Sequence, residues 1–349
     1  MTASEVLHDS HSLLALARAY PEHLDEAFES VLPGGGRLSA TDAAILEIAP
    51  GQPSSTWLVL STGVHGNETA PMEILDRLVA DILGGTLEVA VNLLLLIGNP
   101  PAMIEQRREL NHNLNRLFAG KHRDLADKGD AEAGRAALLE ARVRRFFDAA
   151  GAGDLKLHYD LHTALRASRH EKFVVYPYLH DRPRELDQIR QWMAGGVNTF
   201  LLSHQPAPTF SYFSSKHCGA HGFTVELGKV RPFGENRLAD FAEAETMLRK
   251  LIGGAPGDTG TQDPEQGNFY RVVGEITRDT ENFRLHLAPD AANFTTFDEG
   301  FLLAEDGGRQ FRIEQEGDAI VFPNPDVAIG HRAGLVVRRI RAADLNGAG

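Results

Sequence analysis

The chain has 349 residues, a length that favours one large domain plus a smaller one over a single core. Its formal net charge of −13 argues against a nucleic-acid partner, because phosphate binding requires surplus lysine and arginine, but it is compatible with a locally positive pocket for a small anion. Cys218 is the only cysteine, the first residues lack a signal-peptide pattern, and the most apolar stretch is shorter than the roughly 20 residues of a membrane span, so we expect a protein of the reducing cytoplasm.

The first 250 residues alternate apolar strand-like runs with segments of helical periodicity. Residues 13–19 and 24–31 have the spacing of short helices. The remaining patterns predict strands at 43–48, 57–60, 91–97, 155–161, 173–176 and 223–227, and helices at 72–82, 131–150 and 239–252. Strands that alternate with helices predict an α/β fold with a mixed, largely parallel sheet flanked by helices.

The composition changes at residues 253–258, where the sequence GGAPGD is typical of a linker. Beyond it, strand-like segments separated by Gly, Asp and Pro turns dominate, at 270–276, 301–304, 309–313, 320–322 and 335–340. We therefore predict an α/β domain over residues 1–253 and a small β-rich domain over residues 259–349.

The first candidate site is His65-Gly66-Asn67-Glu68, which lies where a predicted strand ends and a helix begins. Open α/β folds place their ligands at the carboxyl ends of the strands, and glycines permit the tight turn that lets His65 and Glu68 converge on one ion. An imidazole nitrogen and a carboxylate oxygen are ordinary zinc ligands. The alternative is a polar helix N-terminus without a metal.

A second candidate is the predicted strand that contains His158, Asp160 and His162, which share one face because side chains alternate along a strand. His162, at the end of the strand, can complete a set of two histidines and one carboxylate, which leaves the open position of a catalytic zinc. Asp160 can hold either a ligand imidazole or the metal-bound water by a hydrogen bond. The alternative is an internal strand with hydrogen-bonded polar residues.

Glu226 is a third candidate, because it lies in the middle of the predicted strand 223–227, where a carboxylate is costly unless it is paired or functional. In a zinc hydrolase it would be the general base that takes a proton from water. The alternative is an ion pair with Lys229 or an arginine.

The segment 106–118 concentrates arginine and asparagine just after a strand. The planar guanidinium of arginine suits a carboxylate, and a neighbouring asparagine adds hydrogen bonds that orient it. The alternative is a solvated basic turn.

In this order, the motifs resemble those of zinc carboxypeptidases. Residues 63–71 (GVHGNETAP) and 160–164 (DLHTA) look like the aspartoacylase/succinylglutamate desuccinylase family. Four further segments resemble the desuccinylase branch of that family, at 98–102 (GNPPA), 224–229 (TVELGK), 270–273 (YRVV) and 322–325 (FPNP). The resemblance covers nearly the whole chain and is weakest over about the first 40 residues.

The resemblance implies a zinc-carboxypeptidase-like fold and one Zn2+ per chain. By matching motifs, it implies His65, Glu68 and His162 as zinc ligands and Glu226 as the catalytic base. It also implies that substrate carboxylates are bound by Arg108, Asn115 and Arg116, while the cations Arg166, Arg169 and Lys229 are supported only by their nearness to the motifs. The chain departs from the family at one position, since aspartoacylases have Asp-Leu-Asn-Arg where this chain has Asn113-Leu114-Asn115-Arg116.

The reaction that the resemblance implies is hydrolysis of N2-succinyl-L-glutamate to succinate and L-glutamate, the last step of the succinyl-transfer route of arginine degradation. The expected partner is therefore a small anionic N-acyl amino acid, without nucleic acid or membrane. Two alternatives stay open at this point: a related, aspartoacylase-like N-acyl amino acid deacylase, and a non-catalytic zinc-binding protein of the same fold.

Overall fold

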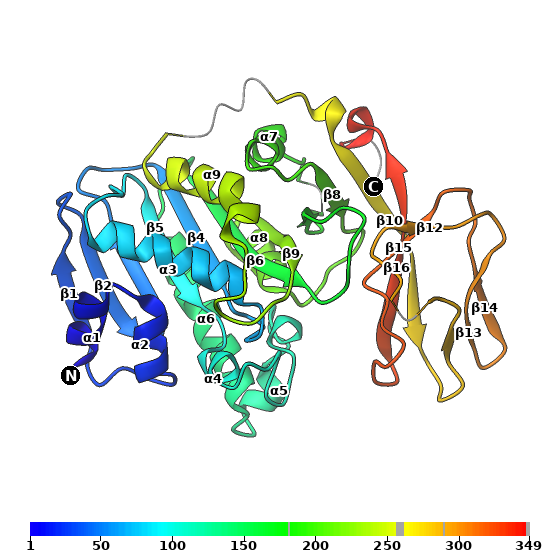
Figure 1. The fold of residues 1–349 in the computed structure, drawn as a ribbon, viewed down its shortest axis with the longest axis horizontal. Coiled ribbons are helices and arrows are strands. Elements are labelled where there is room, and N and C mark those ends of the chain that lie inside the picture. The colour runs from blue at the N-terminus through cyan, green and yellow to red at the C-terminus, as the bar shows by residue number, and fades with distance from the viewer. Residues whose placement is uncertain (181, 256–261, 289, 347–349) are drawn as a thin grey trace.

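A mixed sheet of thirteen strands runs through the residues that this computed structural model describes, which are 1–180, 182–255, 262–288 and 290–346 (Figure 1). Its strands, in the order in which they lie side by side, are β1 (Phe28–Val31), β2 (Arg37–Asp42), β3 (Ile45–Ala49), β5 (Asn92–Ile97), β4 (Thr56–Thr62), β6 (Leu155–Ala164), β9 (His221–Lys229), β7 (Phe173–Tyr176), β8 (Thr199–Leu202), β10 (Asn268–Arg278), β16 (His331–Ile340), β15 (Ala319–Val321) and β12 (Thr295–Thr296).

The centre of this sheet is parallel. Strands β5, β4, β6 and β9 are parallel to one another, whereas the outer strands on both sides pair mainly antiparallel. The predicted α/β fold with a mixed, largely parallel sheet is thus confirmed. Because the carboxyl ends of parallel strands meet at one edge, the residue runs that follow β4 and end β6 and β9 come together there.

Helices cover both faces of the sheet (Figure 1). They are α1 (Ala3–Ser10), α2 (Leu13–Ala19), α3 (Thr69–Leu83), α4 (Pro100–Ile104), α5 (Arg123–Ala126), α6 (Ala131–Asp148), α7 (Leu186–Ala194), α8 (Phe210–Cys218) and α9 (Ala242–Ile252), with short 3-10 helices η1 (Leu114–Arg116), η2 (Leu238–Phe241), η4 (Pro264–Gln266) and η5 (Ala342–Asp344). One apolar core joins α2, α3, α7 and α9 to one face, and a second core joins α6 and α8 to the other.

Helix α3 anchors the loop that follows β4. Its residues Leu75 and Leu78 are almost fully buried against the sheet, and burial of such a side chain contributes about 1.5–3 kcal/mol to stability. Glu68 occupies the N-cap position of this helix, so the packing of α3 also fixes the position of the Glu68 backbone.

The helix predicted at residues 24–31 is wrong. Residues 28–31 form edge strand β1, in which Phe28 lies opposite Ala40 and Val31 opposite Arg37 of β2. Pairing with β2 decides this segment, since tertiary contacts override a short helical spacing. Helix α1 was missed, although Thr2 and Glu5 form a capping box whose spacing is visible in the sequence.

The C-terminal region continues the same sheet, because β10 pairs in parallel with β8 and antiparallel with β16. A second sheet of three strands, β11 (Arg284–Leu285), β13 (Leu302–Asp306) and β14 (Arg309–Arg312), completes the predicted small β domain. The domain limits at residues 253 and 259 stay a prediction, and residues 256–261 lie outside the described residues. Within the described chain, no helix has the length and apolarity to cross a membrane.

Candidate metal centre and active site

Two glycines shape the turn after β4. Gly63 has a φ of +61°, in the left-handed region that favours glycine. Gly66 lies against α4, where a Cβ atom would come within 2.2 Å of the carbonyl carbon of Ala102. Its backbone N–H donates to the carbonyl of Arg108. The turn therefore brings segment 106–118 next to His65.

His65, Glu68 and His162 converge at the carboxyl edge of the sheet, as the sequence predicts. Each offers one potential ligand atom, and these atoms all lie within 4.8 Å of one another, with all three residues buried. Nδ1 of His65 is 2.8 Å from Oε1 of Glu68, and Nδ1 of His162 is 2.9 Å from Oε2. The backbone N–H of Thr163 donates to Oε2 of Glu68 at 3.0 Å.

In both imidazoles, the ring nitrogen that faces away from Glu68 lies within hydrogen-bond distance of an oxygen atom. Nε2 of His65 lies 3.1 Å from Oδ1 of Asn113, and Nε2 of His162 lies 2.9 Å from Oδ2 of Asp160. A metal-bound histidine usually donates its second ring N–H to such an oxygen, which leaves the other nitrogen as the ligand. The donor set and its orientation thus fit a metal ion held through the two Nδ1 atoms and Glu68.

The electrostatics of the cluster favour a cation. Burial opposes ionisation of Glu68, but the imidazoles of His65 and His162 outweigh it and hold the pKa of Glu68 well below its usual range. Burial lowers the pKa of His65 to about 4. Burial also acts against the charged form of His162, yet Asp160 and Glu68 raise its pKa well above the ordinary value. A metal ion bound through His162 would therefore displace a proton from it.

Glu226 lies beside this cluster on β9, in register with His162 of β6. Its side chain is buried, and Oε2 has no hydrogen-bond partner among the described residues. Burial and the charge of Glu68 raise the pKa of Glu226 to about 7. Among the described residues, Glu226 forms no ion pair with an arginine or with Lys229, which is exposed at the end of β9, so the alternative from the sequence does not hold there. An unpaired carboxylate with such a pKa can exchange protons near neutrality.

The predicted carboxylate-binding residues have different surroundings. Arg108 donates to Oε1 of Glu68 at 2.7 Å, so its guanidinium is next to the metal cluster. The side-chain oxygen of Asn115 accepts from the backbone N–H of Phe210 at 3.0 Å, which ties η1 to the start of α8. Part of Arg116 is exposed to solvent. The protein around its guanidinium still disfavours the charged form, and together with the charges of Arg332 and Arg108 this lowers the pKa of Arg116 to about 10.

Comparison with known proteins assigns these motifs to one family. Residues 54–252 match the succinylglutamate desuccinylase/aspartoacylase catalytic domain, and residues 265–340 match the AstE/AspA barrel-sandwich hybrid domain. The chain belongs to the succinylglutamate desuccinylase/aspartoacylase family. It is 44% identical over 334 residues to succinylglutamate desuccinylase of Idiomarina loihiensis, covering 95% of this chain and 97% of that protein. The corresponding Shewanella sp. (strain MR-7) protein is 42% identical over 94% of this chain and 95% of its own length.

Solved structures of this family share the fold. Succinylglutamate desuccinylase of Vibrio parahaemolyticus matches with a TM-score of 0.86 at 33% identity, over 95% of each chain. That of Chromobacterium violaceum matches with a TM-score of 0.83 at 38% identity, over 95% of this chain and 98% of its own. Murine aminoacylase 3, at 18% identity and a TM-score of 0.57 over 83% of this chain and 97% of its own, resembles it in fold alone.

Sequence reasoning missed Arg332 and the role of Asn113. Arg332 lies on β16, opposite Thr277, and is half-buried. Neither Arg332 nor Arg116 forms an ion pair with a described carboxylate, although burial lowers the pKa of both. No motif surrounds Arg332 in the sequence. Asn113 was visible as a departure from the family pattern, and the structure places it against a candidate metal ligand.

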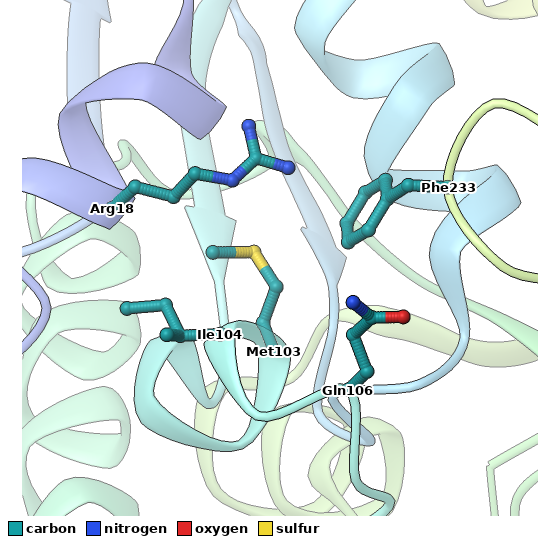
Figure 2. A pocket seen from close by; sticks show the side chains of 5 residues that line it. All are labelled: Arg18, Met103, Ile104, Gln106 and Phe233. Carbon is teal, nitrogen blue, oxygen red and sulfur yellow. The ribbon is translucent and has the colours of Figure 1, made fainter.

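A separate cavity of about 250 Å3 lies beside α4 and contains none of the candidate site residues (Figure 2). It is lined by Arg18, Met103, Ile104, Gln106 and Phe233. The guanidinium carbon of Arg18 lies 5.0 Å from the centre of the Phe233 ring. Without a carboxylate or a histidine in its wall, this cavity lacks the groups that hydrolysis of an amide requires.

The raised pKa of Glu226 predicts how pH affects the metal-free protein. Between the ordinary value of 4.5 and about 7, the folded chain keeps the Glu226 proton whereas the unfolded chain has lost it. The free energy of unfolding therefore falls as pH rises through this window. Glu226→Gln lacks this titration, so its zinc-free melting temperature should rise relative to wild type between about pH 4 and about pH 8, by at least about 2 °C. A melting-temperature difference that does not change with pH would place the pKa of Glu226 in its ordinary range.

Proposed function

We propose that this chain is a zinc-dependent amide hydrolase that converts N2-succinyl-L-glutamate and water to succinate and L-glutamate, the last step of the succinyl-transfer route of arginine degradation. The observation that carries the proposal is the buried cluster of His65, Glu68 and His162 beside the unpaired carboxylate of Glu226. The family relationship, with relatives of this activity at 40–44% identity over nearly the whole chain, supports the same substrate. A cytoplasmic location stays a prediction.

The metal would be held by Nδ1 of His65, Nδ1 of His162 and the Glu68 carboxylate. Zinc bound there would act as a Lewis acid on the amide carbonyl and on water. Oε2 of Glu226, which has no hydrogen-bond partner among the described residues, would accept a proton from the water that attacks the succinyl carbonyl carbon. Glu226 then returns that proton to the glutamate nitrogen as the carbon–nitrogen bond breaks. Asp160 and Asn113 fix the orientation of the two ligand imidazoles.

Three carboxylates on the substrate require a cationic pocket. Arg108 adjoins the metal cluster, and Arg116 is influenced by the charges of both Arg108 and Arg332. These arginines, which come from both the α/β region and β16, would bind the carboxylates, with Asn115 holding the backbone of η1 in place. Arg166, Arg169 and Lys229 stay predictions as further substrate-binding cations.

Removal of the Arg116 guanidinium should weaken substrate binding. A hydrogen bond to a charged group contributes about 1.5–3 kcal/mol, so Arg116→Ala should raise KM for N2-succinyl-L-glutamate about 10- to 100-fold and change kcat less. Steady-state kinetics across substrate concentrations measures both constants.

A matched control for Arg116 is Arg107→Ala, because Arg107 lies on the same segment but is more than half exposed and pairs with Glu105 at 3.2 Å. Its KM should equal that of wild type, whereas Arg332→Ala should act in the same direction as Arg116→Ala. An unchanged KM in Arg116→Ala would favour the alternative interpretation of segment 106–118, a solvated basic turn without a role in substrate binding.

A deacylation screen of the zinc-loaded protein tests the proposed function directly. We expect the highest kcat/KM for N-succinylglutamate among N-succinyl and N-acetyl derivatives of glutamate and aspartate. A preference for N-acetylaspartate would favour the alternative of an aspartoacylase-like deacylase. Absence of turnover for all of these substrates, with zinc bound, would favour a non-catalytic zinc protein.

A further inference from the structure

A buried row of polar side chains extends from Asp160 away from the metal cluster. Oγ of Ser61 on β4 lies 2.6 Å from Oδ1 of Asp160 and 2.8 Å from Nε2 of His158. Nδ1 of His158 lies 2.7 Å from Oγ of Ser214 on α8. Ser61, His158, Asp160 and Ser214 are all fully buried. The row thus connects strands β4 and β6 and helix α8 to the Asp160 carboxylate, which contacts His162.

The donors and acceptors in this row follow one direction. A carboxylate only accepts, so the hydroxyl of Ser61 donates to Asp160 and must accept from Nε2–H of His158. Burial lowers the pKa of His158 to about 4, so its ring is neutral and Nδ1 accepts from Ser214. The Ser214 hydroxyl is nearer to this nitrogen than to the carbonyl of Ser211, at 2.7 against 3.0 Å. Asp160 thereby receives one hydrogen bond on each oxygen, from Ser61 and from His162.

We propose that Ser61 and His158 are positioning residues that hold the Asp160 carboxylate, and through it the His162 imidazole, in the orientation that a metal ligand requires. The inference rests on the metal site of the proposed function. Ser61 and Asp160 are paired neighbours on β4 and β6, so the hydroxyl restrains one oxygen of the carboxylate while His162 contacts the other. His158 is itself held by an edge-on ring contact with Phe210 at 4.6 Å and by Ser214.

This arrangement differs from ordinary filling of a core. The same strand β4 also carries the buried hydroxyl of Thr62, which has no hydrogen-bond partner among the described residues. Thr62 shows that this part of the sheet tolerates a hydroxyl without a network. The neighbouring Ser61 is instead linked on one side to Asp160 and on the other to His158. The two residues therefore provide a matched pair for a test.

The test compares the zinc affinity of Ser61→Ala with that of Thr62→Val, each measured by competition with a chromogenic chelator. Loss of a partner behind a metal ligand typically costs 10–100-fold in metal affinity, so Ser61→Ala should bind zinc about 10-fold more weakly than wild type. Thr62→Val should match wild type. Equal affinities for wild type and Ser61→Ala would overturn the inference alone, whereas absence of zinc binding in wild type would overturn the metal site together with it.

A second pair of variants guards against a loss of folding. His158→Phe keeps a ring against Phe210 but removes both nitrogens, whereas His158→Gln keeps an N–H donor for Ser61. We expect His158→Phe to resemble Ser61→Ala and His158→Gln to restore most of the zinc affinity. The visible absorption of the Co2+-substituted protein should shift in Ser61→Ala and His158→Phe only, since it reports ligand orientation. Lower metal-free melting temperatures with unchanged zinc affinity and an unchanged Co2+ spectrum would show a purely structural role and overturn the inference.

Discussion

Glu226→Gln is expected to lower kcat by a factor of about 10²–10⁴, because that is the usual contribution of general acid–base catalysis. The substitution keeps the shape of the side chain and removes its ability to transfer a proton. Zinc content should stay at the wild-type level, since Glu226 is not one of the three residues proposed to hold the ion. KM should change little, because the proton transfer occurs only in the transition state.

Measurement of kcat, zinc content and melting temperature on one preparation separates catalysis from structure. If Glu226 were only a structural residue, its replacement would change stability and leave turnover per folded molecule near normal. Activity within a few-fold of wild type, with zinc in place, would show that Glu226 is not the base. In the active wild type, kcat/KM should fall on acidification with a midpoint between pH 4.5 and about pH 7. Burial raises the pKa of Glu226 to about 7, and the positive charge of a bound metal would lower it again.

The convergence of His65, Glu68 and His162 was predictable because it depends on local sequence and on one general property of parallel sheets. His65 and Glu68 follow β4, and His162 lies near the end of β6, so adjacent parallel strands place all three at the same edge. Alternation along a strand was enough to put Asp160 on the face of His162. The prediction therefore required no knowledge of how the helices pack.

The surroundings of the site were less accessible to sequence reasoning. Arg332 comes from β16, more than two hundred residues after Arg116, and only the tertiary fold brings its charge near that arginine. Ser61 directly follows the predicted strand 57–60 and received no role from the sequence, because only the register of β4 against β6 sets it opposite Asp160. Asn113 was assigned to a substrate-binding segment, yet its side chain contacts His65. In each case the decisive contact is between residues distant in sequence.

The same limit explains the wrong helix at residues 24–31. That segment has a spacing compatible with either structure over so short a length, and short apolar patterns cannot be resolved by periodicity alone. The antiparallel partner β2, itself missing from the sequence prediction, supplies the backbone hydrogen bonds that make residues 28–31 a strand. An unpredicted partner strand therefore produced an incorrect element beside it.

His162→Ala should remove most of the zinc from the protein. Wild type should bind one zinc per chain, and loss of a ligand must cost more than the 10–100-fold in affinity that loss of a partner behind a ligand costs. We therefore expect His162→Ala and His65→Ala each to bind zinc at least about 100-fold more weakly. Metal analysis after dialysis, together with competition by a chelator, measures this effect.

His112→Ala provides the control for these two substitutions. His112 is the neighbour in sequence of Asn113, which contacts His65, but it is partly exposed and pairs with Asp130 at 2.9 Å. It should retain one zinc per chain, which excludes a general effect of removing an imidazole. Zinc affinity of His162→Ala should also lose much of the pH dependence expected of wild type, because wild-type His162 would have to release a proton to bind the metal. Full zinc occupancy in His162→Ala would sink the assigned ligand set, since Glu68 and His65 alone cannot hold the ion as three ligands do.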